Sequence, residues 1–111
     1  MAYATIIRAV VTPKTHAPYL ASFPCTVDSR SQRDLVAKAF GHSAFVEAET
    51  NDDGISFPAD LVAGLKLDEA LLTINGVEVS SHVFSSLAGA RDEIARALAQ
   101  GCAVQTFVCV E

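Results

Sequence analysis

Two segments near the start of the chain are mostly apolar, with only a few polar positions in each. Residues 3–11 are rich in β-branched and aromatic side chains, and residues 19–27 form a second extended run. This pattern predicts two β-strands joined by a loop. Pro24 interrupts the second run. Because proline cannot donate a hydrogen bond to a sheet ladder, we expect an edge strand, a bulge or a position that faces away from the neighbouring strand.

A helix is predicted next, because apolar residues over residues 32–40 recur at helical spacing. Asp28, Ser29 and Ser31 are candidates for capping its beginning, and Gly41 ends the pattern.

The longest helix is predicted between Ser80 and Gly101. Ser80 and Ser81 can cap it, and Gly89 is expected to split it or to mark where its regular part begins. Residues 103–110 then form a closing strand. The apolar stripe of the helix consists of Val83, Leu87, Ala90, Ile94 and Leu98, with Phe84 and Ala97 alongside.

The segment between these helices contains the strongest turn signal of the chain, Thr-Asn-Asp-Asp-Gly over residues 50–54. Residues 43–49 before it are predicted to form a third strand, in which Phe45 is the largest apolar residue. After it we expect a short helix from Pro58 to Gly64. Proline suits a first helical position, and glycine can adopt the left-handed conformation that closes a helix.

A strand, a tight turn and another strand are predicted to follow. Residues 70–74 are mostly aliphatic or β-branched, Asn75 and Gly76 tolerate the positive φ angles of a two-residue turn, and residues 77–79 resume as a strand. This second half of the chain resembles a PDZ domain, whose pattern here is G-L-x-x-G-D-x-I-L-x-V-N-G-x-x-V. The residues on family positions, without a gap, are Pro58, Ala59, Asp60, Gly64, Leu65, Leu72, Asn75, Gly76 and Val79, with Leu71 and Ile74 as conservative variants.

One departure from the family pattern is the Gly-Asp pair, which is Asp68-Glu69 here. Aspartate tolerates a left-handed conformation better than most residues, so the turn is expected to survive. The resemblance implies an α+β fold over a single domain, residues 1–111. This fold is a PDZ-like small five- to six-stranded β-barrel or sandwich capped by two helices, with an extra helix between the second and third strands. A ubiquitin-like β-grasp is the alternative, because an initial hairpin followed by a helix matches residues 3–40.

The resemblance also implies a non-enzymatic peptide-binding module. In the family, a ligand adds as a strand between the second strand and the long helix, and backbone N–H groups of a glycine-rich loop hold its terminal carboxylate. The Gly-Leu-Gly-Phe loop of the family is absent here, and Pro18 and Pro24 remove donors. The second hypothesis is therefore a structural or oligomerisation module without a free-peptide ligand. The expected peptide-binding residues are Tyr19, Leu20, Ala21, Ser22 and Phe23 on the strand, and Phe84, Leu87, Ala90 and Ile94 on the helix; His82 is interpreted as a loop or cap residue.

Composition and charge narrow the classes of partner. The chain has 111 residues, half of them hydrophobic, and a net charge of −5, which argues against nucleic acid or an anionic membrane surface as partner. We expect no membrane span and no signal peptide. Cys25, Cys102 and Cys109 lack CxxC spacing, so a reducing, cytoplasmic location is predicted. The expected partner is a protein or peptide, with an apolar C-terminus as one possibility, and the chain itself is a homo-oligomer or part of a larger chain.

Catalytic and metal-binding patterns are not evident. Cys25 could be paired with His16 or His42 as nucleophile and base, but no local signature supports this, and a structural role is preferred. The acidic residues Glu47, Glu49, Asp52 and Asp53 do not have the spacing of a calcium loop. We therefore predict a protein that is not an enzyme and needs neither metal nor cofactor.

Overall fold

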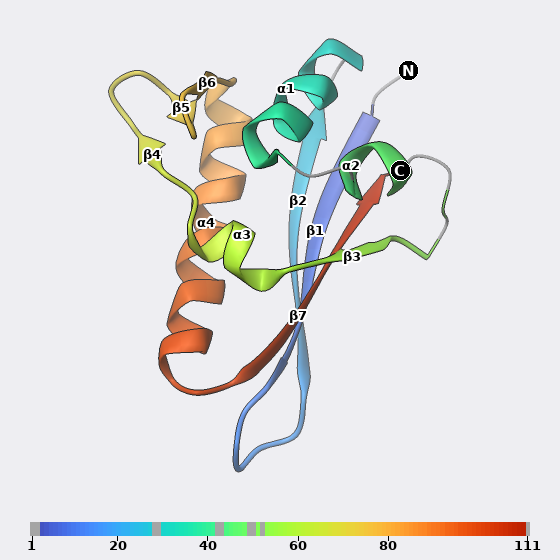
Figure 1. The fold of residues 1–111 in the computed structure, drawn as a ribbon, viewed down its shortest axis with the longest axis vertical. Helices are drawn as coiled ribbons and strands as arrows, with labels where there is room; N and C mark the ends of the chain where they lie inside the picture. Colours follow the sequence, from blue (N-terminus) through green and yellow to red (C-terminus); the bar gives the residue numbers. More distant parts are fainter. Residues whose placement is uncertain (1–2, 28–29, 42–43, 49–50, 52, 111) are drawn as a thin grey trace.

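The computed structural model describes residues 3–27, 30–41, 44–48, 51 and 53–110, which form an α+β fold with two antiparallel sheets (Figure 1). The larger sheet has the strand order β2-β1-β7-β3. Its strands are β1 (Tyr3–Thr12), β2 (Tyr19–Val27), β7 (Ala103–Val110) and β3 (Ile55–Phe57). The predicted α+β class is confirmed at this level, whereas the numbers of strands and helices differ from the predicted ones.

The first, second and last strands follow the sequence prediction closely. β1 pairs with β2 on one side and with β7 on the other, in both cases antiparallel. β2 lies at the edge of the sheet, and Pro24 is opposite Ile6. Of the three alternatives expected from Pro24, the structure therefore contains the edge strand.

Three of the helices also begin and end near the predicted residues. They are α1 (Arg30–Phe40), α3 (Ala59–Ala63) and α4 (Ser81–Ala99). Ser80 caps α4, because its Oγ accepts a hydrogen bond from the backbone N–H of Val83 at 3.2 Å. The helix continues through Gly89, so the predicted interruption there is wrong. The cap candidates Asp28 and Ser29 lie outside the described residues.

The predicted third strand over residues 43–49 is wrong. The described part of this segment contains helix α2 (Ala44–Glu47), and β3 follows the predicted turn instead of preceding it. Ala44, Phe45 and Ala48 are buried, a spacing of one and four residues that fits one face of a helical turn. Of the predicted turn, Thr50 and Asp52 lie outside the described residues, and Gly54 has a φ of +83°.

The smaller sheet consists of three two-residue strands, β4 (Leu67–Asp68), β5 (Thr73–Ile74) and β6 (Val77–Glu78). Asn75 (φ +51°) and Gly76 (φ +80°) form the predicted turn between β5 and β6. The predicted strand over residues 70–74 is shorter than expected, because Leu72 adopts a positive φ of +51°. Gly64 has a φ of −93°, so the predicted left-handed helix end is wrong.

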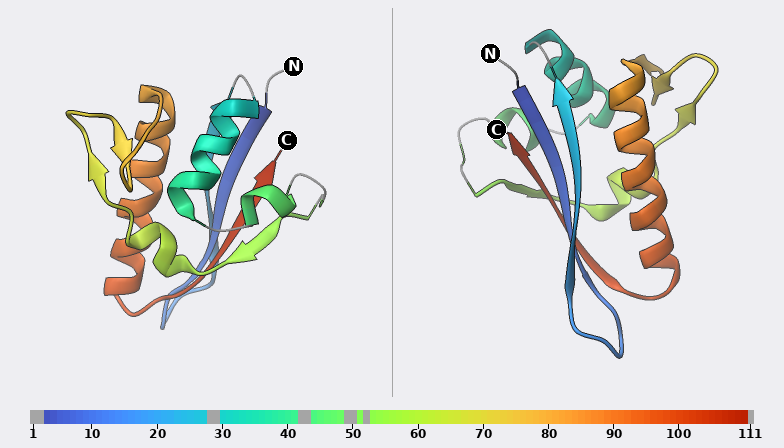
Figure 2. Two further views of the ribbon diagram at one scale, coloured as in Figure 1. Left: turned by 45° about the horizontal axis from the view of Figure 1, so that its top comes forward. Right: turned by 180° about the vertical axis from the view of Figure 1, so that it is seen from behind.

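Helices α1, α2 and α3 lie in front of the larger sheet in Figure 1, whereas α4 runs beside its edge strand β2 (Figures 1 and 2). Strand pairing assigns the buried residues Thr5, Ile7, Ala9 and Val11 to this core face. The opposite face is uncovered by any described helix, and Figure 2 shows it from behind. Its residues include Ile6, Arg8, Val10, Leu20, Ser22, Gln105 and Phe107, none of which is fully buried.

Candidate functional site

The four predicted binding residues of the long helix belong to the hydrophobic core. Leu87, Ala90 and Ile94 have no exposed surface, and Phe84 is 8% exposed. Their side chains therefore stabilise the fold by burial and are not available as the wall of an open groove. His82 is exposed in the first turn of α4.

The predicted residues of β2 are much more accessible. Tyr19 is 45% exposed and Leu20 is 61% exposed, which are large values for apolar side chains. Ser22 is also exposed, whereas Ala21 and Phe23 are half-buried. The structure therefore brings the strand residues together along one accessible edge and separates them from the predicted residues of the helix.

A direct contact closes the space between α4 and β2 at the level of Pro24. The Ser86 hydroxyl donates a hydrogen bond to the backbone carbonyl of Pro24. α4 and β2 are in contact with each other. Because a strand in a sheet lies about 4.8 Å from its neighbour, no additional strand fits between helix and sheet at this level.

The same contact shows which backbone groups of β2 point outward. The carbonyl of Pro24 is directed away from β1 and toward α4, and proline has no N–H to donate to β1. In an antiparallel ladder the N–H and C=O of one residue point to the same side, and the side alternates along the strand. Ser22 and Leu20 precede Pro24 by two and four residues. Their N–H and C=O groups therefore point to the same side as those of Pro24, away from β1.

Tyr19, Leu20 and Ser22 are exposed, and among the described residues no backbone hydrogen bond from an element other than β1 reaches residues 19–22. Figures 1 and 2 show α4 running beside β2 toward a C-terminal end that leads into β7. The accessible part of the edge is therefore assigned to residues 19–22. We call these residues the open edge of β2.

The open edge carries no charge. Residues 18–27 contain no ionisable acid or base other than Tyr19 and Cys25, although the chain as a whole has a net charge of −5. Arg8 lies opposite Ser22 on the neighbouring strand and is the nearest cation by strand pairing. This edge therefore suits an uncharged, extended segment of a partner.

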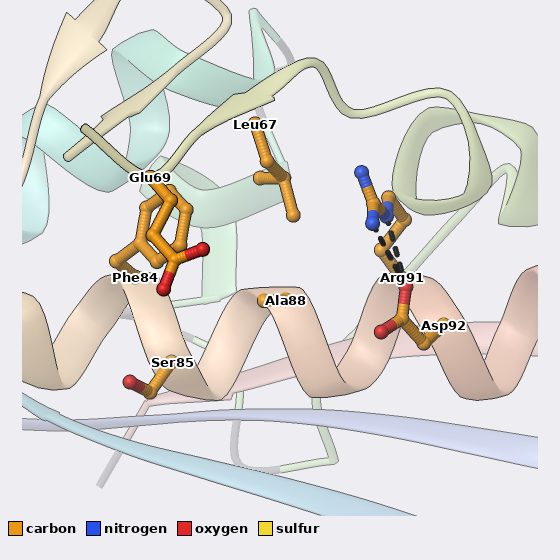
Figure 3. Close-up of a pocket in the computed structure, with 7 residues that line it drawn as sticks. All are labelled: Leu67, Glu69, Phe84, Ser85, Ala88, Arg91 and Asp92. Carbon is orange, nitrogen blue, oxygen red and sulfur yellow. Dashed lines mark hydrogen bonds and ion pairs between the residues drawn. The ribbon is translucent and has the colours of Figure 1, made fainter. Parts of the chain in front are cut away.

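A separate groove of about 490 Å³ lies between α4 and the segment around β4 (Figure 3). Its lining consists of Leu67, Glu69, Phe84, Ser85, Ala88, Arg91 and Asp92. Arg91 Nε and one of its terminal nitrogens donate to Asp92 Oδ1 at 3.1 and 2.9 Å. Sequence reasoning found only Phe84 of this set, although Phe84, Ala88 and Arg91 have the spacing of one helix face.

No protein-family model matches the chain, and no curated protein or solved structure is similar to it. Within the described ranges, no three His, Cys, Asp or Glu residues are placed to hold a metal ion. The described helices are all too short or too polar to cross a bilayer. Function is therefore inferred from the geometry of the open edge.

Cys25 is a poor candidate for a nucleophile, because it is buried in the core. Burial raises the pKa of the Cys25 thiol from 9.0 to about 11, so the thiolate is scarce near neutral pH. His16, one of its two imagined bases, is exposed in the loop between β1 and β2, and His42 lies outside the described residues.

The raised thiol pKa predicts a change of stability at alkaline pH. Above pH 9 the unfolded chain loses the Cys25 proton while the folded chain keeps it, so the free energy of unfolding falls as pH rises to about 11. We expect this contribution to disappear in Cys25→Ala and to persist in Cys102→Ala. Urea unfolding between pH 8 and about 11 measures it. Identical pH profiles for the wild type and Cys25→Ala would contradict the assignment.

Proposed function

We propose that this protein is a non-enzymatic protein–protein interaction module that binds its partner by β-strand addition to the open edge of β2. The observation that carries the proposal is the outward direction of the N–H and C=O groups of Leu20 and Ser22 at an exposed sheet edge. An edge of this kind binds an extended segment through main-chain hydrogen bonds, and neighbouring side chains select its sequence.

The PDZ resemblance of the second half of the chain supports the same binding mode, since PDZ ligands pair with the second strand. The proposed site differs from the family site in its position along the strand. It uses residues 19–22, because Ser86 occupies the space beside Pro24. The partner segment should be extended and largely uncharged, with apolar residues that contact Tyr19 and Leu20.

A second candidate function is a structural module without a free-peptide ligand, with a PDZ-like or β-grasp fold. The burial of Leu87, Ala90 and Ile94 favours it, because these residues would line the groove of a peptide-binding family member. The two candidates differ in whether a free peptide protects the open edge.

Amide-resolved NMR with a panel of extended apolar octapeptides, each with a free and an amidated C-terminus, tests the proposed function. We expect the amide signals of Leu20 and Ser22 to shift and to become protected from exchange in the presence of a bound peptide. The backbone N–H groups of Ala21 and Phe23 point toward β1, so they should already be protected from exchange without a peptide.

The matched variants are Ser22→Pro and Ser22→Ala. Proline at this position removes an outward donor without removing a bond to β1, whereas alanine keeps the donor. We expect Ser22→Pro to lose peptide binding about tenfold, and Ser22→Ala to bind within about twofold of the wild type. Protection that appears elsewhere on the molecule, or none across the panel, would contradict the proposal.

A further inference from the structure

We infer that the partner strand is β2 of a second copy of this chain, related by a two-fold axis that passes beside Ala21 and perpendicular to the sheet. The inference rests on the proposed function, because it requires an open edge that accepts a strand. Two larger sheets would then join edge to edge into one continuous sheet.

The main-chain groups of the open edge fit one antiparallel register of β2 against itself. With the axis at Ala21, Leu20 of each copy lies opposite Ser22 of the other, and every outward N–H and C=O of these residues finds a partner. A shift that places Leu20 opposite Leu20 would pair Ser22 with Pro18, which has no N–H, and would leave the Ser22 carbonyl unpaired. A shift that places Ser22 opposite Ser22 would pair Leu20 with Pro24, which has the same defect.

Pro18 and Pro24 stand at equal distances from Ala21 along the chain, three residues to either side. In the inferred register they stand just outside the two ends of the shared ladder, where the two strands separate because Ser86 occupies the space beside Pro24. Both lack a donor, and the carbonyl of Pro24 already accepts from Ser86. The paired segment is therefore limited to the residues between the two prolines, which is the part of β2 that α4 leaves free.

Side chains support the same register. Tyr19 of each copy lies opposite Phe23 of the other, in a pair without main-chain bonds between its members, where side chains approach most closely. Tyr19 is 45% exposed in the single chain, and contact with an aromatic ring would cover part of that surface. On the uncovered face, the Leu20 side chains of the two copies become diagonal neighbours within reach of each other.

The charge distribution is compatible with self-association at this edge. Two chains of net charge −5 repel each other, so a surface shared by two copies should lack acidic residues. Residues 18–27 contain none, and the cation Arg8 lies beside the open edge. The two copies can therefore approach along β2 without opposing carboxylates.

A cysteine scan of the open edge tests the register. In the inferred dimer the Ala21 α-carbons of the two copies are about 4.5 Å apart, which is close enough for a disulfide. The α-carbon of Leu20 in one copy is about 7 Å or more from that of Leu20 in the other copy, and the same holds for Ser22. We expect Ala21→Cys to form a covalent dimer under mild oxidation faster than Leu20→Cys or Ser22→Cys, with the wild type as the background for its native cysteines. Faster cross-linking at position 20 or 22 would overturn the register.

Sedimentation of the wild type, Ser22→Pro, Ser22→Ala and Tyr19→Ser up to about 1 mM tests the association itself, in the range of small transient interfaces. We expect a concentration-dependent dimer that Ser22→Pro weakens about tenfold or more, that Tyr19→Ser also weakens, and that Ser22→Ala preserves. Circular dichroism confirms that each variant is folded. A dimer insensitive to both Ser22→Pro and Tyr19→Ser would overturn the inference.

The outcome can be separated from that of the proposed function. A protein that stays monomeric throughout, while octapeptides protect the amides of Leu20 and Ser22, retains the proposed function and loses this inference. A protein that neither dimerises nor binds a peptide at the open edge loses both.

Discussion

Phe45→Ala is expected to lower the free energy of unfolding by about 3–5 kcal/mol, the largest effect of any single truncation considered for this chain. Phe45 has no exposed surface, and its ring centroid lies 4.6 Å from that of Phe40 and 5.9 Å from that of Phe57. Truncation would leave a cavity at the point where α1, α2 and β3 meet. A loss of this size is a large fraction of the stability of an ordinary domain.

Phe107→Ala is the matched control for this prediction. Phe107 is half-buried on the uncovered face of the sheet, so its truncation should lower the free energy of unfolding by no more than about 1.5 kcal/mol. Urea unfolding followed by circular dichroism measures both variants. Equal losses of unfolding free energy in the two variants would contradict the assignment of Phe107 to an uncovered face of the sheet.

Asn75→Ala is expected to lower the free energy of unfolding by about 2–3 kcal/mol. Asn75 Oδ1 accepts a hydrogen bond from the backbone N–H of Lys66 at 2.9 Å, and Nδ2 donates to the carbonyl of Ala39 at 2.7 Å. These bonds join the turn after β5 to the segment before β4 and to the end of α1. Alanine would remove both and would also disfavour the positive φ of this position.

Asn75→Gly separates the two causes, because glycine accepts the positive φ but makes neither side-chain bond. We expect its loss to be smaller than that of Asn75→Ala, by about 1 kcal/mol. The comparison uses the same urea transitions. A glycine variant as stable as the wild type would mean that the two side-chain bonds contribute nothing to stability.

The sequence predicted those elements whose signals are local. β1, β2 and β7 are long runs of β-branched and aliphatic residues, and α4 has both an apolar stripe and a serine cap. The Asn75-Gly76 turn depends on positive φ angles at two adjacent residues, which asparagine and glycine adopt more readily than other residues do.

Other elements depend on contacts with distant residues and were mispredicted. Residues 44–47 form a helix whose Phe45 packs against Phe40 and also against Phe57, which belongs to β3 on the other side of the turn. Leu72 adopts an unusual positive φ, which no local propensity predicts for leucine. Such contacts are invisible to a window of neighbouring residues.

Only part of the candidate site could be predicted from the sequence, because the rest depends on contacts between residues far apart in the chain. The extended run over residues 19–27 predicted a strand, and Pro24 gave an edge strand as one of three alternatives, which is the one that the structure contains. Whether a helix lies against that edge depends on the packing of the whole domain. The bond from Ser86 to Pro24 joins residues far apart in the sequence, and it determines which part of the edge remains accessible.

That bond also has a protective consequence. A bare strand margin is a template on which identical chains can stack without limit, as in amyloid fibrils. Here the template is interrupted, since Pro24 lacks a donor and its acceptor is occupied by Ser86. The interruption at Pro24 should therefore restrict the growth of fibres from this margin, whether or not the open edge binds a strand as proposed.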